Sequence, residues 1–372
     1  MHPRTPVRLA ALACAVLVSA APLAAQDAGD EDNVPACPVD HHSLEIPAPG
    51  HGLSLGNSAR HTGIRVNLVD RCVERVSGVN LTLWKPKDNP DLVVNGVAVG
   101  LLAPVARDIN GVGVGGLAVI AEEDLHGIGA GGLAVIVEER IVGIAAGGLA
   151  VIGDRGIDGI AAGGLATIAE GDVNGVAAGG LAAITEGRLT GIAAGGLASI
   201  VDGSVRGIGI GGLASIVDGP VTGLSVGGLG VVVDGEVTGV SVAGLGVVVD
   251  GPVRGVTIGG LGAVADGPMD GINVGGLGVV ADGRVRWLTV GGLGVVAEEI
   301  AGLGVAGAYT RTERLSGVAV APYNDVRGTQ RGLTIGIYNY TRDLRGVQLG
   351  LLNYVRHNPP GRRLLPIVNW GG

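Results

Sequence analysis

The sequence predicts an all-β fold, a parallel β-solenoid built from sixteen-residue coils. Three observations support this prediction: a Gly-containing phrase that returns every sixteen residues, an alternation of period two inside each copy, and 72 Gly but no Phe among 372 residues. Long helices are excluded, because each Gly inside a helix costs about 1 kcal/mol relative to Ala. A mean hydropathy of +0.48 provides ample apolar surface to bury, which excludes a disordered chain.

The chain begins with a segment typical of a secretory signal peptide, residues 1–25. Arg4 and Arg8 precede an apolar run over residues 9–21, and small residues follow that run. This order of basic, apolar and small residues predicts export and removal of the segment. We therefore expect the protein in the periplasm, in the outer membrane or at the cell surface, with residues 26–49 as an extended leader.

Two cysteines remain after removal of the signal segment, Cys37 and Cys72. An even number of cysteines in an oxidising compartment favours a disulfide between them. In the loop-entropy model, this disulfide would stabilise the folded chain by about 3–4 kcal/mol. Free thiols, or a metal site shared with His41 and His42, are the alternatives.

The regular repeat occupies residues 111–302, and looser copies over residues 50–110 are expected to form an irregular cap. Written generally, a regular copy is G-[IV]-x-[AVI]-[GA]-G-L-[AG]-x-[IV]-x-[DE] followed by four more variable residues, and Trp287 replaces Gly in the twelfth copy. The seventh position is always Leu: Leu117, Leu133, Leu149, Leu165, Leu181, Leu197, Leu213, Leu229, Leu245, Leu261, Leu277 and Leu293. Apolar or small residues at even positions indicate an extended strand, and the acid-Gly pair at positions twelve and thirteen indicates a turn.

Two architectures satisfy this pattern. In a solenoid each copy is one coil, and every position stacks on its equivalent about 4.8 Å away. In an antiparallel β-meander each copy is one strand, and the meander closes into an outer-membrane-type barrel. Constant copy length and the lack of aromatic girdles favour the solenoid, because membrane barrels alternate short turns with long loops and carry aromatic belts.

The C-terminal segment, residues 303–372, differs from the array in charge and aromatic content. It has nine Arg and three acidic residues, whereas the array has seven Arg and twenty acidic residues. Arg and Tyr are enriched where proteins bind other molecules, so we predict a contact surface here, with an aromatic cap as the alternative. The residues of this predicted surface are Tyr309, Tyr323, Tyr338, Tyr340, Tyr354, Arg342 and Arg345. A net charge of −9 disfavours nucleic acid as the partner.

An acidic residue at position twelve of every copy forms a second candidate site. Stacked coils would align these carboxylates along one edge, where solvation or turn amides are expected to stabilise them. A ladder of divalent cations is the alternative. Its candidate ligands are Asp202, Asp218, Asp234, Asp250, Asp266 and Asp282.

Motifs that would indicate catalysis are weak or absent. Gly111, Gly113 and Gly116 match G-x-G-x-x-G, but that motif binds dinucleotides only between a strand and a helix. The sequence has no G-x-S-x-G, H-E-x-x-H or Walker motif. We therefore expect no enzymatic activity and no cofactor.

Phrases near the C-terminus resemble a family of uncharacterised bacterial surface-repeat proteins with units of the type G-L-Q-[IL]-G-L-[IL]-N. They are G-L-T-I-G-I-Y-N at 332–339, G-V-Q-L-G-L-L-N at 346–353 and L-P-I-V-N-W at 365–370. The similarity is close over residues 317–370, whereas the strict array lacks the Gln and Asn of those units. The resemblance implies a surface location and adds no catalytic residue.

Together these observations predict an exported, non-enzymatic β-repeat protein that acts as a scaffold or adhesion-type interaction module of the bacterial cell surface. Its partner would belong to the envelope or the surface, and association with the outer membrane is compatible with this prediction. The alternative function is that of an outer-membrane β-barrel, either a pore or an anchor.

Overall fold

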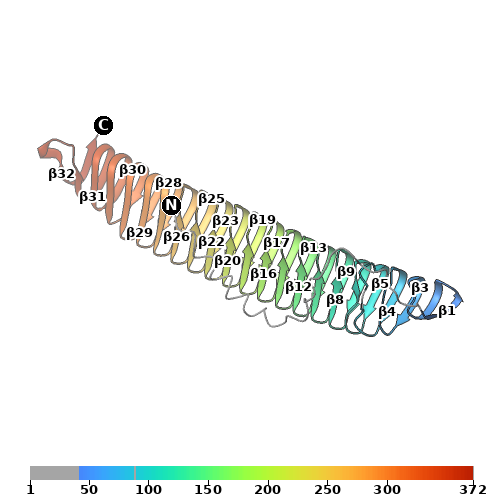
Figure 1. Cartoon of the computed structure of the whole chain (residues 1–372). Coiled ribbons are helices and arrows are strands. Elements are labelled where there is room, and N and C mark those ends of the chain that lie inside the picture. The colour runs from blue at the N-terminus through green and yellow to red at the C-terminus, as the bar shows by residue number, and fades with distance from the viewer. Residues whose placement is uncertain (1–41, 88, 372) are drawn as a thin grey trace, which may run out of the picture. The chain divides into compact units, whose positions relative to one another are not determined.

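The structure is a computed structural model and describes residues 42–87 and 89–371. Over these residues the chain forms a parallel β-solenoid, whose coils stack on one another (Figure 1). Equivalent positions of adjacent copies are paired, so that Gly127 lies between Gly111 and Gly143. The predicted solenoid is confirmed. The antiparallel barrel is wrong, because adjacent copies of the regular repeat pair in parallel and in register.

Each regular coil contributes a longer and a shorter strand, and these form two parallel columns of strands. The long-strand column spans the end of one copy and the first five positions of the next: β7 (Asp108–Gly115), β9 (Leu125–Gly131), β11 (Arg140–Gly147), β13 (Gly156–Gly163), β15 (Asp172–Gly179), β17 (Leu189–Gly195), β19 (Val205–Gly211), β21 (Val221–Gly227), β23 (Val237–Ala243), β25 (Val253–Gly259) and β27 (Met269–Gly275). The short-strand column spans positions eight to eleven: β8 (Ala118–Ala121), β10 (Ala134–Val137), β12 (Ala150–Gly153), β14 (Ala166–Ala169), β16 (Ala182–Thr185), β18 (Ala198–Val201), β20 (Ala214–Val217), β22 (Gly230–Val233), β24 (Gly246–Val249) and β26 (Gly262–Ala265).

Less regular coils continue the stack at both ends. The N-terminal strands are β1 (Ser43–Ala48), β2 (His51–Gly56), β3 (Arg60–Asn67), β4 (Arg75–Thr82), β5 (Val93–Gly100) and β6 (Val105–Ala106). The C-terminal elements are β28 (Gly278–Gly291), β29 (Gly294–Ala306), β30 (Tyr309–Val320), β31 (Tyr323–Val355), the single 3₁₀ turn η1 (Pro360–Arg362) and β32 (Leu364–Gly371). Trp287 pairs with Gly302, so the twelfth copy is one residue shorter than the others.

The core lies between the two columns, and the odd positions of the repeat form it. In the copy that begins at Gly143, Ala145, Val151 and Ile157 are fully buried. Their larger neighbours at even positions and at the corner point outward: Ile144 is 46% exposed and Leu149 is 44% exposed. Position fifteen therefore carries a large inward side chain in many copies, the other inward positions carry smaller ones, and many large aliphatic residues lie outside.

The two columns approach each other closely. The hydroxyl oxygens of Ser215 on β20 and Ser225 on β21 lie 3.0 Å apart across the core. A Cβ added at Gly113 would lie 3.0 Å from Cγ1 of Val119, a contact that leaves no room for a larger residue. At positions three and nine the gap accepts Gly, Ala, Ser, Thr, Asn and Val, and a ring as large as that of Phe would not fit there.

The first position of each copy requires Gly for a conformational and a steric reason. Gly175 has φ of 136°, in a region that L side chains rarely adopt. A Cβ on Gly175 would also lie 2.0 Å from the carbonyl oxygen of Gly159 in the preceding coil. Trp287 occupies this position with φ of 79°. The Gly repeat seen in the sequence is thus a column of backbone-to-backbone contacts.

Both ends of the stack are covered by antiparallel strands. β1, which falls within the predicted leader, pairs antiparallel with β2, and β32 pairs antiparallel with β31. In the first coils Arg65 is fully buried and donates to Asp70 Oδ1 at 2.6 Å and to Asn80 Oδ1 at 2.8 Å. The other carboxylate oxygen of Asp70 accepts from Asn80 and from Thr82. A buried charge is therefore neutralised and hydrogen-bonded, as its burial requires.

The disulfide prediction is tested only at one of its two cysteines. Cys72 is disulfide-bonded and 8% exposed. Cys37 lies outside the described residues, so the pairing of these two residues stays a prediction.

Amide side chains replace aliphatic ones in the core of the last coils. Asn324 donates to Asn339 at 2.7 Å, and Asn339 donates to Asn353 at 2.8 Å, so three coils share one ladder. Gln348 donates to Gln330 at 3.1 Å in a second ladder. The Gln and Asn of the C-terminal phrases therefore point inward and hold coils together.

Replacing Gly191 by Ala should destabilise the stack strongly. Gly191 has φ of 132°, and its added Cβ would lie 2.0 Å from the carbonyl oxygen of Gly175. We expect the free energy of unfolding to fall by about 2–4 kcal/mol, measured by denaturant titration followed by far-UV circular dichroism. Gly230→Ala is the matched control, because its nearest atom would be 3.9 Å away and earlier copies carry Ala there. Equal losses for both variants would contradict this account.

The amide ladder gives a second prediction. Asn339→Ala should lower the free energy of unfolding by about 2–3 kcal/mol, because it leaves buried amides of Asn324 and Asn353 short of partners. Asn273 is equally buried but its side-chain atoms have no hydrogen-bond partner, and it lies between Thr257 and Thr289. Asn273→Thr should therefore be neutral or stabilising in the same titration, and a loss as large as that of Asn339→Ala would refute the comparison.

Candidate functional site

The predicted Tyr residues come together on the outer surface of the last coils. Tyr309 of β30 pairs with Tyr323 of β31. The rings of Tyr323 and Tyr338 stack with centroids 5.6 Å apart, and those of Tyr340 and Tyr354 stack at 5.7 Å. We call these five residues the Tyr surface. Residues that are far apart in sequence thus form one aromatic surface, as a contact surface requires.

Alternation along the strand explains why these rings face outward. Asn339 is fully buried in the amide ladder, so Tyr338 and Tyr340 on either side of it point away from the core. Partial burial, and next the neighbouring Asp325, raise the pKa of Tyr323. Partial burial, and next Tyr323, raise the pKa of Tyr338. Both phenols therefore stay protonated at neutral pH and can donate hydrogen bonds.

Charged groups border the Tyr surface. Asp325 accepts from Arg311 at 3.2 Å and from Arg327 at 3.3 Å. The guanidinium of Arg311 also lies 6.0 Å from the ring centroid of Tyr309. The arrangement offers flat aromatic rings beside cationic groups, which suits recognition of a polar, planar or sugar-like group.

Arg342 and Arg345, which the sequence analysis grouped with the Tyr residues, line a groove together with Asp343 and His357. There Nδ1 of His357 is 2.8 Å from Oδ1 of Asp343. Arg342 follows the buried Thr341 at the corner after the short-strand column, whereas Arg345 precedes Gly346 on the other side of the coil. Their membership of one contact surface with the Tyr residues stays a prediction.

The carboxylates of position twelve form a line along one corner of the coils, which we call the acidic corner. Burial raises the pKa of Glu186, and Glu170 and Asp202 on the adjacent coils raise it further. The pKa of Asp218 is raised by burial and next by Asp202, and that of Glu122 by burial and next by Glu138. Neighbouring like charges therefore repel along the acidic corner, as stacking in register requires.

The predicted cation ladder has no support from the grouping of ligands. Among residues 42–87 and 89–371, no group of three or more His, Cys, Asp or Glu side chains is arranged to hold a metal ion. Each regular coil brings one position-twelve carboxylate to the corner, and a hard cation needs six or more oxygen ligands. The ladder of Asp202, Asp218, Asp234, Asp250, Asp266 and Asp282 stays an untested prediction.

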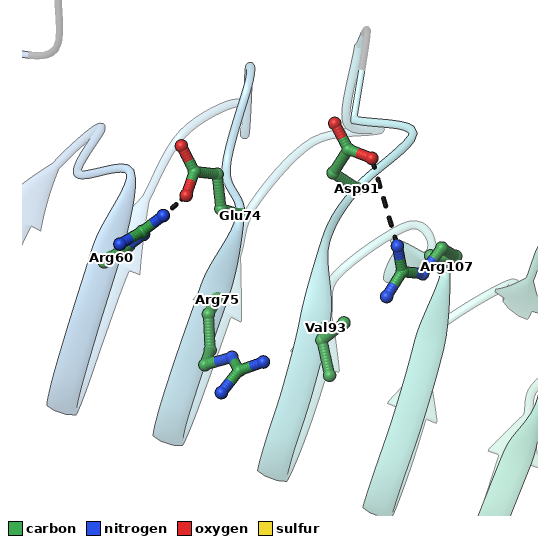
Figure 2. A pocket seen from close by; sticks show the side chains of 6 residues that line it. All are labelled: Arg60, Glu74, Arg75, Asp91, Val93 and Arg107. Atoms are coloured by element: carbon green, nitrogen blue, oxygen red, sulfur yellow. Dashed lines mark hydrogen bonds and ion pairs between the residues drawn. The ribbon is translucent and has the colours of Figure 1, made fainter.

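Sequence analysis missed a charged groove on the first coils (Figure 2). It is lined by Arg60, Glu74, Arg75, Asp91, Val93 and Arg107 and has a volume of about 550 Å³. Arg60 pairs with Glu74 at 2.5 Å, whereas Arg75 forms no ion pair with any described residue. Asp108 is the main cause of the raised pKa of Arg107. Arg60 and Arg75 both stand three residues before a Gly that opens a copy, and this shared spacing was the available signal.

The regular coils also carry a continuous apolar outer surface. In the strict array, the side chains at positions two, four, seven, eight and ten point outward, and position six is Gly. We call these six positions together the apolar surface. No copy places a polar or charged residue at any of these six positions. The Leu residues of position seven are 44–54% exposed throughout the array. Sequence analysis recognised the Leu repeat but did not establish that it faces outward.

Among the described residues, no helix combines the length and hydropathy that crossing a membrane requires. Comparison with models of protein families, with curated proteins and with solved structures finds no match to this chain.

The acidic corner predicts a pH dependence of stability. Glu186 has a higher pKa in the folded chain than its ordinary value of 4.5, so the folded state binds this proton more tightly than the unfolded state. The free energy of unfolding should therefore rise as the pH falls from 7 toward 4.5, and added salt should weaken the part due to repulsion. Melting temperatures across this range measure the effect.

Glu186→Gln should flatten this rise, because it removes a charge between Glu170 and Asp202. Thr190→Ser, an exposed and uncharged change four residues after Glu186, is the control and should leave the slope unaltered. If the melting temperature of Glu186→Gln depends on pH as strongly as that of the native chain, repulsion between the carboxylates of the acidic corner does not lower the stability.

Proposed function

We propose that the protein is an exported, non-enzymatic scaffold of the bacterial cell envelope, an adhesion-type module that contacts its partner through the Tyr surface. The observation that carries this proposal is the gathering of Tyr309, Tyr323, Tyr338, Tyr340 and Tyr354 on one face at one end of a long stack of coils. A stack of this kind holds its outer side chains at a fixed pitch, which is how solenoids build extended binding surfaces.

Rigidity of the Tyr surface supports a role in contact. The amide ladder of Asn324, Asn339 and Asn353 fixes the backbone directly beneath the rings. Stacked rings have already lost side-chain freedom, so binding costs them little conformational entropy. Aromatic side chains that are ordered and only partly covered are typical anchors of binding sites.

Export is supported by the first 25 residues of the sequence and by Cys72, which is disulfide-bonded. Disulfides persist in oxidising compartments and are rare in the bacterial cytosol. The pore that the sequence analysis kept as an alternative depended on the barrel, and it loses its basis with that architecture.

The proposal is tested in cells that produce the whole chain. We expect the protein in the envelope fraction of a Gram-negative host, where protease added to intact cells should digest it. Leu17→Arg places a charge in the apolar run of the signal segment and should keep the chain in the cytoplasm. A native sequence that stays in the cytoplasm would overturn the proposal.

The contact role has its own measurement, the attachment of these cells to one another and to glass. The pair Tyr338→Ser and Tyr340→Ser breaks both ring stacks and should reduce attachment several-fold, with the amount of exported chain unchanged. The matched pair Thr222→Ser and Thr238→Ser on the array should leave attachment as it is. Attachment that is insensitive to the Tyr pair would argue against the Tyr surface as the contact.

A further inference from the structure

We infer that the apolar surface inserts into the acyl-chain region of one lipid leaflet, with the coils lying along the membrane and the acidic corner in water. This inference rests on the proposed envelope location and adds a partner to it. Three features of the coils carry it: the distribution of polar groups, the satisfaction of the backbone and the geometry of the two apolar faces.

Charge is completely segregated in the regular coils. Every Asp, Glu and Arg of residues 111–302 stands at position twelve, thirteen, fourteen or sixteen of its copy. The apolar surface, by contrast, has only Gly, Ala, Val, Ile and Leu. Protein partners are usually met with about one hydrogen bond per 100–200 Å² and a polar rim, and this surface offers no side chain for either. Hydrocarbon demands neither.

The backbone at the exposed corner is also satisfied. Leu133 donates its amide proton to the carbonyl oxygen of Leu117 at 2.6 Å, and Leu149 donates to that of Leu133 at 2.7 Å. Gly132 at the same corner donates to the carbonyl oxygen of Gly115 at 3.0 Å. A peptide group can enter hydrocarbon only when it is hydrogen-bonded internally, and the stack meets that condition at each step of this corner.

The shape of the apolar surface favours a fluid partner over a second copy of the chain. Positions three and nine face each other across the core, so the outward residues around them lie on opposite sides of the coil and meet at the Leu corner. A flat partner or a second copy would cover one side and leave the other in water. Acyl chains can cover both sides and the corner at once, which removes more apolar area from water.

The depth of the apolar surface suits one leaflet. From the Leu corner to the last apolar residue is three residues on one side and five on the other, or roughly 10–17 Å at about 3.3 Å per residue. The hydrocarbon region of one leaflet is about 15 Å thick. Trp287 stands at the boundary, between Arg286 and the apolar Leu288, and is 70% exposed. Trp is the residue most typical of the interface between hydrocarbon and water.

Vesicle flotation with uncharged phosphatidylcholine tests the inference on the purified whole mature chain. We expect the chain to float with the vesicles in both low and high salt. The decisive variant carries Leu181→Gln, Leu197→Gln, Leu213→Gln and Leu229→Gln, residues that are 46–48% exposed. Because these side chains are outside the core and Gln can form ladders along a stack, the variant should fold, and its partition coefficient should fall about 100-fold.

The matched control carries Glu186→Gln, Asp202→Asn, Asp218→Asn and Asp234→Asn on the acidic corner of the corresponding coils. It should float as well as the native chain, and circular dichroism should show that both variants keep their β structure. Failure of the native chain to float, or an equal loss in both variants, would overturn the inference. Light scattering gives the competing outcome: a stable dimer without vesicle binding would assign the apolar surface to a second copy. The proposed function fails separately, by retention of the chain in the cytoplasm.

Discussion

The closeness of the two strand columns is the constraint on which the rest of the molecule depends. Since Ser215 and Ser225 touch across the core, each coil has room for little more than a methyl or hydroxyl group at most inward positions. A core that thin buries little apolar area per residue. Stability must therefore come largely from the backbone hydrogen bonds between coils and from contacts between equivalent side chains of adjacent coils. Each of these contributions depends on register, and this explains the constant length of the regular copies.

The same constraint places the large aliphatic residues outside. Leu, Ile and Val have β propensity and pack well against their equivalents on the neighbouring coils, so an outward position still buries more than half of Ile144 and of Leu149. The cost is a continuous apolar surface that water covers poorly. In the C-terminal coils the balance changes. Amide ladders hold the core there, and Tyr and Arg take the outer positions, which gives that end a surface suited to a more polar partner.

The sequence was sufficient to predict the stacked coils, but it was not sufficient to predict which side chains face outward or which of them lie together. Strict spacing of Gly and Leu implies stacking in register, because only equivalent environments keep equivalent residues. When the odd and the even positions of a strand are both apolar, alternation does not show which set faces the core. The outward direction of Leu149 was therefore known only from the structure. The Tyr residues were found because their type is unusual in this chain. The grouping of Arg342 and Arg345 with these Tyr residues stays a prediction, because charge and sequence proximity alone do not define a surface. Arg60 and Arg75 stand three residues before the Gly of their copies, but Arg107 stands four residues before Gly111, so the full groove is not visible in the sequence.

The corner of the coils that is acidic in the regular array becomes basic toward the C-terminal end. Glu298 occupies this corner in the last regular coil and Glu313 occupies it in the next coil, because Ala297 pairs with Thr312. Thr312 in turn pairs with Val326, and from there on the corner carries Arg327, Arg342 and Arg356. A corner of carboxylates repels anions along the array, while its continuation attracts them at the C-terminal end. An anionic partner approaching the molecule would thus be directed away from the regular coils and toward the end that bears the Tyr surface. The charge of this one corner therefore distinguishes the aromatic end from the regular coils, and it is compatible with the contact proposed there.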